Sequence, residues 1–476
     1  MESLKISENG RYFVTSDGKP FPWLADTAWT LPQSLKWDDV EYYLKKRKSQ
    51  GFTVLQIVAL DPERDVQMRS PAGCKALKNN DLTTPNEEYF SWLDWCLDRA
   101  EEYGFYILLL PVWGQLVVGD NWRGDTFPKT VTKENAGVYG EWIGNRYKNR
   151  KNILWCLGGD RQPIHKGIDY RDIWRAMAVG LAKGVTGKDL DARTPDPAWR
   201  ELLITYHTCY EMETGKCSTY SYWGPEEAWI GFTMLQSGHT KSPRNDLLVT
   251  EEYEKNPPKP VWDGEPAYEK MPATWPVTTD FHGPWMVRKR AFWSLLAGAF
   301  GFTYGHASVW CMISEKEKNK MHPDSWYEAI HSEGSGQMKY LREYIDATEI
   351  QTCIPAQNLL LEPRDGVRAS LAEDKSRFYV YLPEGGEQKL NITDLGWKKK
   401  CLVWYDPRTG KCLMEKTDVT EHTNDTDIFE IEAPSSGENH DWLLIVSSEY
   451  MEEAPVKERE YYSFKEENQV EKVFQW

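Results

Sequence analysis

Eight short apolar runs alternate with segments of helical periodicity between residues 21 and 304. Strands that alternate with helices form parallel sheets, and eight such units close into a (β/α)8 TIM barrel. The sequence therefore predicts an α/β barrel. The expected strands are residues 21–25, 54–60, 106–112, 152–157, 202–206, 230–235, 259–265 and 301–304. The expected helices are residues 38–48, 85–103, 135–147, 170–183, 246–253 and 284–300, after an N-terminal hairpin at residues 4–14.

The pattern changes after about residue 351, where short β runs are separated by turn sequences such as Pro383-Glu384-Gly385-Gly386. This spacing is typical of a small antiparallel β-sandwich. The expected organisation is a barrel at residues 1–350, an accessory β-sandwich at 351–450 and a charged arm at 451–476. We expect the arm to dock on the barrel or on a second copy of the chain, and the β domain is the other candidate for contacts between copies. The arm would dock through its aromatic residues Tyr461, Tyr462, Phe464, Phe474 and Trp476.

Charge and cysteine usage limit the class of protein. A formal net charge of −16 argues against binding to nucleic acid or to an anionic membrane, because both need a basic face. No apolar run reaches the ~18 residues of a membrane span, and the N-terminus lacks a signal-peptide pattern. The nine cysteines are scattered and form no CxxC pair, which fits a reducing compartment. We therefore expect a cytoplasmic location.

Two acidic residues stand behind glycines at the ends of predicted strands. The run Lys151–Asp160, KNILWCLGGD, ends in Asp160, and the run Lys259–Glu265, KPVWDGE, ends in Glu265. Active sites of such barrels lie at the carboxyl ends of the strands. The fourth and seventh strands lie on opposite sides of that opening, so these two side chains can face each other across a bound sugar.

Glycoside hydrolysis needs one protonated and one ionised carboxyl group, and burial can separate two otherwise similar pKa values. This chemistry makes Asp160 and Glu265 candidate catalytic residues. The competing interpretation is structural, since Arg161 follows Asp160 and Pro266 follows Glu265. An ion pair or a helix cap would then explain each acid, but the occurrence of both at strand ends favours catalysis.

Other polar and aromatic residues at strand ends are candidates for binding sugar. Asp26 and Asp61 fit hydroxyl binding and capping equally well, and the indoles of Trp29 and Trp113 fit either a sugar platform or packing. No metal site is expected, because the first strand ends in Ala25-Asp26-Thr27 and lacks His-x-His. No nucleotide-binding motif is present, so no cofactor is expected. The full set of expected substrate-binding residues is Asp26, Trp29, Asp61, Trp113, Gln115, His207, Gln236, His239 and His306.

Three segments resemble the apiosidase-like glycoside hydrolases of family 140: PWLADTAW (residues 22–29), NILWCLGGD (152–160) and DGEPAYE (263–269). The C-terminal part is similar to the small β domain that accompanies them, a module named after collagen binding. The resemblance spans nearly the whole chain. It implies a barrel that removes a terminal apiofuranosyl or related pentofuranosyl residue from plant glycans.

In that family pattern Asp160 would be the general acid and Glu265 its partner. Many barrel glycosidases end the fourth strand in Asn-Glu, whereas this chain has Gly159-Asp160, so retention and inversion both stay open. Two alternatives also stay open. One is a glycosidase of another specificity, such as an arabinofuranosidase or a pyranosidase, and the other is a barrel that binds carbohydrate without cleaving it.

Overall fold

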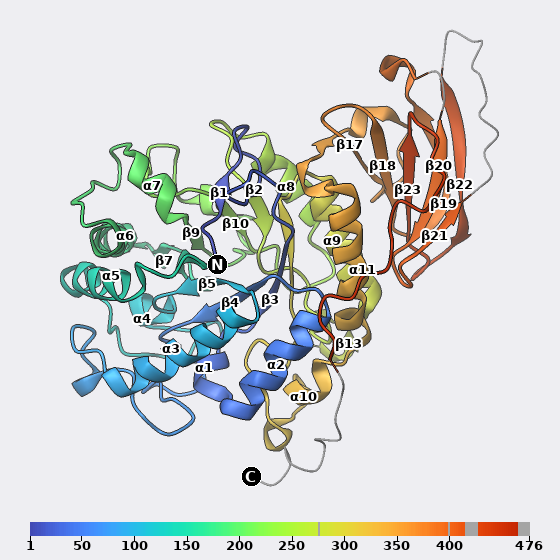
Figure 1. The fold of residues 1–476 in the computed structure, drawn as a ribbon. Coiled ribbons are helices and arrows are strands. Elements are labelled where there is room, and N and C mark those ends of the chain that lie inside the picture. Colours follow the sequence, from blue (N-terminus) through green and yellow to red (C-terminus); the bar gives the residue numbers. More distant parts are fainter. Residues whose placement is uncertain (275–276, 398–399, 415–426, 465–476) are drawn as a thin grey trace.

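The computed structural model describes residues 1–274, 277–397, 400–414 and 427–464. Eight parallel strands form the predicted barrel (Figure 1). Six pair continuously in the order β14-β3-β4-β5-β6-β9, and β10 pairs with β11. Backbone hydrogen bonds from Gly231 to Ile204 (2.8 Å) and from Phe300 to Val261 (3.0 Å) join the two parts. The strands are β3 (Trp23–Thr27), β4 (Val54–Val58), β5 (Tyr106–Leu110), β6 (Ile153–Gly158), β9 (Ile204–His207), β10 (Thr233–Leu235), β11 (Val261–Asp263) and β14 (Gly301–Tyr304).

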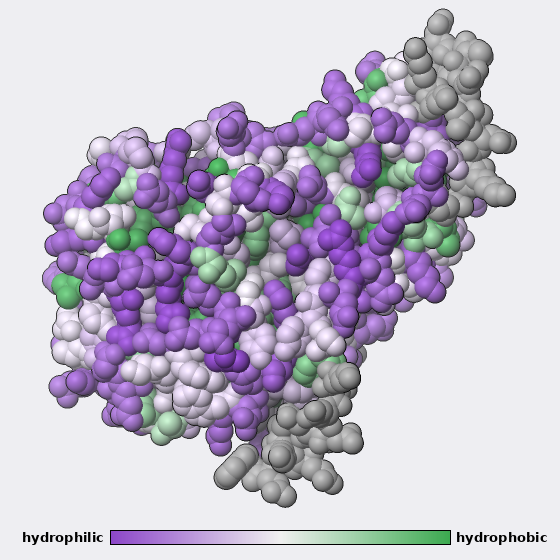
Figure 2. Space-filling view, in the orientation of Figure 1, coloured by the Kyte–Doolittle hydropathy of each residue, from purple (hydrophilic) through white to green (hydrophobic). Residues whose placement is uncertain are grey.

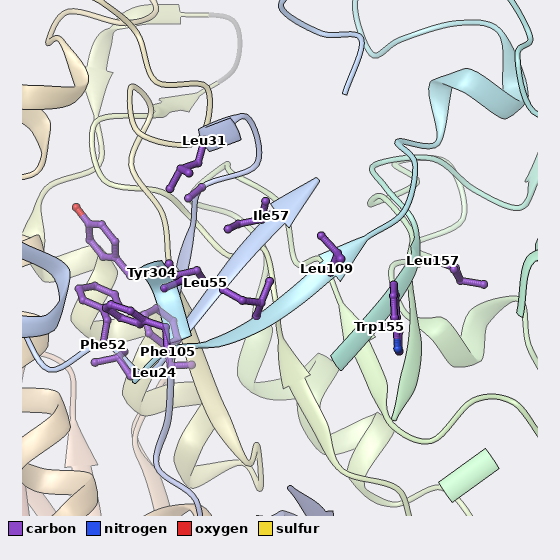
Figure 3. Packing of buried hydrophobic residues seen from close by; sticks show 14 of the residues in the cluster. Leu24, Leu31, Phe52, Leu55, Ile57, Phe105, Leu109, Trp155, Leu157 and Tyr304 are labelled. Atoms are coloured by element: carbon purple, nitrogen blue, oxygen red, sulfur yellow. The ribbon is translucent and has the colours of Figure 1, made fainter. Parts of the chain in front are cut away.

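Alternation along these strands separates two apolar layers. Side chains that point outward pack between the sheet and the helices, and Figure 3 shows Leu24, Leu55 and Trp155 in this layer. Their neighbours Ala25, Val54 and others point into the barrel. A strand with both faces buried is a continuous apolar run in the sequence, and this pattern predicted all eight barrel strands.

Aromatic rings fill the lower interior of the barrel. The hairpin of β1 (Lys5–Ile6) and β2 (Phe13–Val14) places the ring of Phe13 4.9 Å from that of Phe300 and 5.2 Å from that of Phe232. Trp262 lies 5.4 Å from Phe232 and 5.7 Å from Trp23. Large rings account for much of the buried surface of a core, so these side chains close one end of the barrel. The functional site is therefore expected at the opposite end, where the strands finish.

Helices surround the strands, and their ends follow local capping chemistry. The side chain of Thr132 accepts the N–H of Asn135 while Asn135 bonds back to Thr132, which fixes the start of α5. The long helix α11, which follows the last strand, was absent from the prediction, as was α7. The main helices are α2 (Trp37–Ser49), α3 (Glu87–Glu102), α5 (Lys133–Tyr147), α6 (Arg171–Thr186), α7 (Pro197–Leu202), α8 (Asn245–Tyr253), α9 (Pro284–Leu296) and α11 (Glu333–Thr348); α1 (Leu31–Ser34), α4 (Gln115–Val118) and α10 (Trp326–Ala329) are single turns.

Loops at the strand ends carry two small hairpins, β7–β8 (Ile164–His165 and Ile168–Asp169) and β12–β13 (Pro272–Thr274 and Val277–Phe281). Both belong to the end of the barrel where the strands finish. We call this end, with the loops that follow the eight strands, the mouth.

The C-terminal lobe in Figure 1 is an antiparallel sandwich, as predicted. A six-stranded sheet in the order β15-β17-β18-β23-β20-β21 packs on a three-stranded sheet in the order β16-β19-β22, with Phe378, Leu390 and Ile431 in the shared core. Its strands are β15 (Ile354–Pro355), β16 (Leu360–Leu361), β17 (Arg368–Leu371), β18 (Arg377–Leu382), β19 (Gly385–Asn391), β20 (Cys401–Asp406), β21 (Lys411–Met414), β22 (Ile428–Ser436) and β23 (Trp442–Ser447).

Helix α9 joins the two lobes. The buried guanidinium of Arg288 binds the buried carboxylate of Asp441 at 2.6 Å, and the indole N–H of Trp293 donates to the carbonyl of Gly366 at 2.7 Å. Removing one partner of a buried ion pair strongly destabilises a protein, because the other charge stays buried without compensation. The sandwich is therefore fixed to the barrel rather than tethered by a linker.

The described part of the C-terminal arm packs on the barrel of its own chain. Tyr461 donates to Asp346 at 3.0 Å, the ring of Tyr462 lies 5.8 Å from Tyr103, and the ring of Phe464 lies 5.4 Å from Tyr42. Phe474 and Trp476, the other expected docking residues, lie outside the described residues.

The surface seen in Figure 2 is mostly hydrophilic, with hydrophobic side chains scattered over it. Among the described residues, no helix combines the length and apolarity needed to cross a membrane.

Candidate active site

Asp160 is placed by an unusual backbone at the end of β6. Gly158, Gly159 and Asp160 have φ values of +87°, +112° and +48°, a region that glycine enters freely and aspartate tolerates. A Cβ on Gly158 would lie 2.2 Å from the carbonyl oxygen of His207, and one on Gly159 would lie 2.5 Å from the Trp113 ring. The two glycines of the GGD motif are thus required for the chain to turn between β5 and β9 and present Asp160 at the mouth.

Glu265 is placed by a second glycine. Strand β11 ends at Asp263, whose carboxylate points out of the barrel and accepts hydrogen bonds from Ser237 (2.7 Å) and Asn245 (3.0 Å). A Cβ on Gly264 would lie 2.4 Å from Cε of Met234, so the chain passes close to β10 here. Because the strand has ended, Glu265 turns away from Asp263 and into the mouth, where its side chain is 8% exposed.

Two of the three predicted histidines hold the Glu265 carboxylate. Nε2 of His207 lies 2.7 Å from Oε2, and Nε2 of His239 lies 3.3 Å from Oε1. The backbone N–H of Asp160 donates to Nδ1 of His207 at 3.4 Å. His207 therefore links the backbone of one acid to the carboxylate of the other.

These surroundings push the pKa values of the two acids in opposite directions. Burial raises the pKa of Asp160, with Arg161 opposing and the charge of Glu265 adding to the rise. Burial also acts to raise the pKa of Glu265, but the contacts with His207 and His239 outweigh it and hold that pKa below its usual value. One carboxyl group thus tends to keep its proton while the other stays ionised.

Gln236 and Gln115 reach the site by different contacts. The amide of Gln236 donates to Oδ1 of Asp160 at 3.2 Å, as expected for a residue at the end of β10. Gln115 is fully buried beside the carboxyl group of Glu63. Gln115 therefore packs within the wall of the mouth and presents no surface to a substrate.

Asp61 caps a turn, which was one of the two roles left open for it. Its Oδ1 accepts the N–H of Glu63 at 2.7 Å, while Oδ2 has no hydrogen-bond partner among the described residues. Burial, with the nearby charge of Glu63, raises the pKa of Asp61 to about 7. The structure thus favours capping over direct hydroxyl binding.

The expectation that Asp26 binds substrate is wrong. Asp26 shares the outward face of β3 with Leu24, and its carboxylate binds the guanidinium of Arg47 at 2.7 Å, with both side chains fully buried. Tyr43 also donates to it. This residue joins β3 to α2 beneath the barrel surface, away from any sugar.

The expectation that His306, after the last barrel strand, binds substrate is also wrong. Its Nδ1 accepts the N–H of Ser308 at 3.0 Å and its Nε2 lies 3.2 Å from Oγ of Ser332. Burial lowers its pKa to about 3, so the ring is neutral and has both nitrogens engaged. It fixes the loop before α11.

Trp29 and Trp113 form a wall for His207 instead of an open sugar platform. The Trp29 indole stacks on the His207 ring at 5.5 Å, and Trp113 meets the same ring edge-on at 5.6 Å. Their exposures are 1% and 4%, so neither offers a free face. The packing interpretation left open by the sequence is the one that fits.

The ion pair of Arg161 with Asp160, an alternative that the sequence left open, is present, and three further residues of the mouth escaped the sequence analysis. Arg161 donates to Oδ2 of Asp160 at 3.1 Å and to its carbonyl oxygen. Tyr268 is buried beside Glu265, whose charge adds to the effect of burial in raising the tyrosine pKa. Glu63 and Arg123 pair at 3.1 Å. Tyr268 lies within the DGEPAYE segment, which was a usable signal, whereas nothing marked Glu63 or Arg123.

The barrel and the sandwich each match a family model. Residues 7–352 match "Apiosidase-like, catalytic domain", and residues 354–447 match "Putative collagen-binding domain of a collagenase". No curated protein matches the chain significantly.

Solved structures agree with these matches. A protein described as a glycoside hydrolase is similar with a TM-score of 0.77 and 26% identity, covering 94% of this chain and 97% of that one. A family 5 glycoside hydrolase from Bacteroides vulgatus is similar with a TM-score of 0.78 and 25% identity, covering 94% of this chain and 93% of that one. The family model covers most of the chain and includes the barrel, the GGD motif and the acid that follows β11. The chain belongs to the apiosidase-like family of glycoside hydrolases.

Proposed function

We propose that this glycoside hydrolase removes a terminal pentofuranosyl residue, apiosyl or closely related, from plant-derived oligosaccharides or glycosides. Asp160 acts as the general acid and Glu265 as the ionised partner. The observation that carries the assignment is that the two carboxyl groups lie at one mouth with different partners, Arg161 and Gln236 on Asp160 and two histidines on Glu265. A glycosidase needs this division of roles between two carboxyl groups.

Each acid has surroundings suited to its part. Asp160 is buried, which favours its protonated form, and its side chain still has 18% of its surface exposed for a glycosidic oxygen to reach. Transfer of its proton to that oxygen releases the leaving group. Glu265 is held ionised by two histidines and either attacks the anomeric carbon or activates the water that does.

The choice of sugar rests on the match to the apiosidase-like family model. Fold and acids are shared by many specificities, so an arabinofuranosidase or a pyranosidase is the second candidate. The two differ in a measurable way, because a site shaped for one sugar discriminates against another by kcat/KM.

The test is hydrolysis of a panel of 4-nitrophenyl glycosides containing β-D-apiofuranoside, α-L-arabinofuranoside and common pyranosides. We expect the apiofuranoside to have the highest kcat/KM. Asp160→Asn, prepared in parallel, controls for contaminating glycosidases. A higher kcat/KM for any pyranoside would reject the proposed sugar, and NMR of the first-formed anomer would decide between retention and inversion.

A further inference from the structure

The side chain of Tyr268 is held in one place at the mouth. It is 1% exposed, and its ring lies against the backbone that follows β14, where a Cβ on Gly305 would lie 2.1 Å from Cδ1 of the ring. The ring also packs on that of His239, with the ring centres 4.3 Å apart. Backbone hydrogen bonds from Glu269 N–H to the Gly305 carbonyl (2.9 Å) and from Ala307 N–H to the Glu269 carbonyl (2.9 Å) fix the adjoining chain. Packing therefore sets the position of the tyrosine hydroxyl group.

This hydroxyl group is buried and has no hydrogen-bond partner among the described residues. Its polar neighbours are the hydroxyl of Thr27, at the end of β3, and the carboxylate of Glu265, and Asp160 lies within electrostatic reach. The Thr27 hydroxyl already accepts the side-chain amide of Gln56 at 3.3 Å. Burying a hydroxyl group costs free energy unless it is hydrogen-bonded. An unpaired hydroxyl beside a reacting carboxylate indicates a partner that arrives with the substrate.

A second buried polar atom without a partner adjoins the other acid. The amide nitrogen of Gln236 donates to Oδ1 of Asp160 at 3.2 Å, which leaves its Oε1 as an acceptor, and this oxygen is also unpaired among the described residues. Sugar hydroxyl groups both donate and accept, so a sugar between the two acids can satisfy Gln236 and Tyr268 together. A site built in this way discriminates against a ligand that leaves its buried polar groups unpaired.

We propose that the Tyr268 hydroxyl binds a hydroxyl group of the sugar residue that lies between Asp160 and Glu265. The inference rests on the proposed function, because those two acids fix where the sugar to be removed must lie. Tyr268 thus contacts the released sugar and not the leaving group. A role confined to supporting the Glu265 carboxylate is the alternative, and the pH profile separates the two.

Tyr268→Phe tests the proposal, since it removes the hydroxyl group and keeps the packed ring. We expect kcat/KM to fall roughly 3- to 10-fold, the size of one hydrogen bond, and by the same factor for 4-nitrophenyl and methyl apiofuranosides, which share the sugar. The pH profile of kcat/KM should stay in place. In an Asp160→Asn background, which blocks hydrolysis, isothermal titration calorimetry should show weaker binding of 4-nitrophenyl apiofuranoside at unchanged stoichiometry.

Tyr344→Phe is the matched control. Tyr344 on α11 is fully buried, and its hydroxyl group also lacks a partner among the described residues. Its ring packs on those of Phe292 (5.6 Å) and Tyr405 (5.0 Å), which lie in α9 and the sandwich. This substitution therefore makes the same chemical change away from the two acids. We expect it to keep wild-type kinetics and binding.

Three results would overturn the proposal. They are a Tyr268→Phe variant with wild-type kcat/KM or unchanged binding, a loss confined to one of the two glycosides, and an acid limb that moves to higher pH, which would assign the hydroxyl to Glu265 instead. Unchanged activity of Asp160→Asn would refute the proposed function separately. If the wild-type enzyme cleaves arabinofuranosides but no apiofuranoside, the proposed sugar fails, and the same measurements on arabinofuranosides decide the role of Tyr268.

Discussion

The ends of β6 and β11 and the ends of β3 and β14 carry similar polar residues but use them differently. Asp160 and Glu265 turn into the mouth and are bridged by His207. Asp26 lies on the outer side of β3 and binds α2, whereas His306 follows β14 and binds the loop before α11. A position at the end of a barrel strand is therefore insufficient to identify a site residue, because the side on which the residue lies decides its role.

The local backbone explains the difference. At β6 and β11 glycines break the strand before the acid, so the acid escapes the alternation of the pleat. In β3 the strand continues past Asp26 to Thr27, and alternation keeps Asp26 with Leu24 on the outside. If this explanation is right, substitutions of Asp160 or Glu265 should reduce activity, and substitutions of Asp26 or His306 should reduce stability.

The largest expected effect is that of Asp160→Asn. Loss of the general acid should lower kcat/KM by about 10²- to 10⁴-fold. Asparagine tolerates the left-handed backbone at this position, so the denaturant midpoint should stay at its wild-type value. Steady-state kinetics and urea unfolding of the same preparation check both statements. Retained activity would remove Asp160 from the reaction.

Asp26→Asn should show the reverse pattern. It leaves the buried guanidinium of Arg47 without its counter-charge, and breaking a buried pair in this way costs roughly 3–5 kcal/mol of unfolding free energy. The kcat of the folded fraction should be unchanged. Should this variant fail to fold, Tyr43→Phe removes one hydrogen bond to Asp26 and should cost about 0.5–1.5 kcal/mol. A normal midpoint with a reduced kcat would contradict the comparison.

Histidine substitutions should separate the two sides by pH dependence. His239 helps to hold the pKa of Glu265 below its usual value, so His239→Gln raises that pKa. Because Glu265 must be ionised, activity is lost as pH falls through its pKa, and the acid limb of the kcat/KM profile should move to higher pH by about one unit. His306→Gln should leave the profile in place, since His306 is neutral and its ring nitrogens are engaged by Ser308 and Ser332. Equal shifts of the acid limb in both variants would contradict the proposed difference in role between His239 and His306.

A small effect is expected for Glu269→Gln. The carboxylate of Glu269 accepts the N–H groups of Gly334 (2.9 Å) and Ser335 (3.1 Å) at the start of α11, and Tyr304 donates to it at 2.7 Å. Loss of its charge at a helix N-terminus and of one of its acceptors should lower the unfolding free energy by about 1–2 kcal/mol. Chemical denaturation measures this change, and the pH profile should be unaffected. A shifted profile would show that Glu269 influences the ionisation of Asp160 or Glu265.

Much of the architecture could be predicted from local pattern alone. Buried parallel strands are continuous apolar runs, amphipathic helices repeat at helical spacing, and both signals survive without knowledge of neighbours. Helix α11 escaped because Gly334 and Gly336 weaken its pattern, while its N-terminus is stabilised by Glu269, a residue distant in sequence. The start of this helix is therefore held by a tertiary contact.

The sequence by itself determined the barrel, the sandwich and the two acids behind glycines, because each of these depends on residues adjacent in the chain. Only the tertiary structure decided that His207 and His239 belong with Glu265, that Glu63 and Arg123 belong with Asp160, and that Asp26 and His306 do not. The physical reason is that desolvation, charge and hydrogen bonding act through space. Which side chain a buried carboxylate meets depends on the curvature of the sheet and on how the loops of separate strands pack together, and residues adjacent in the chain determine neither.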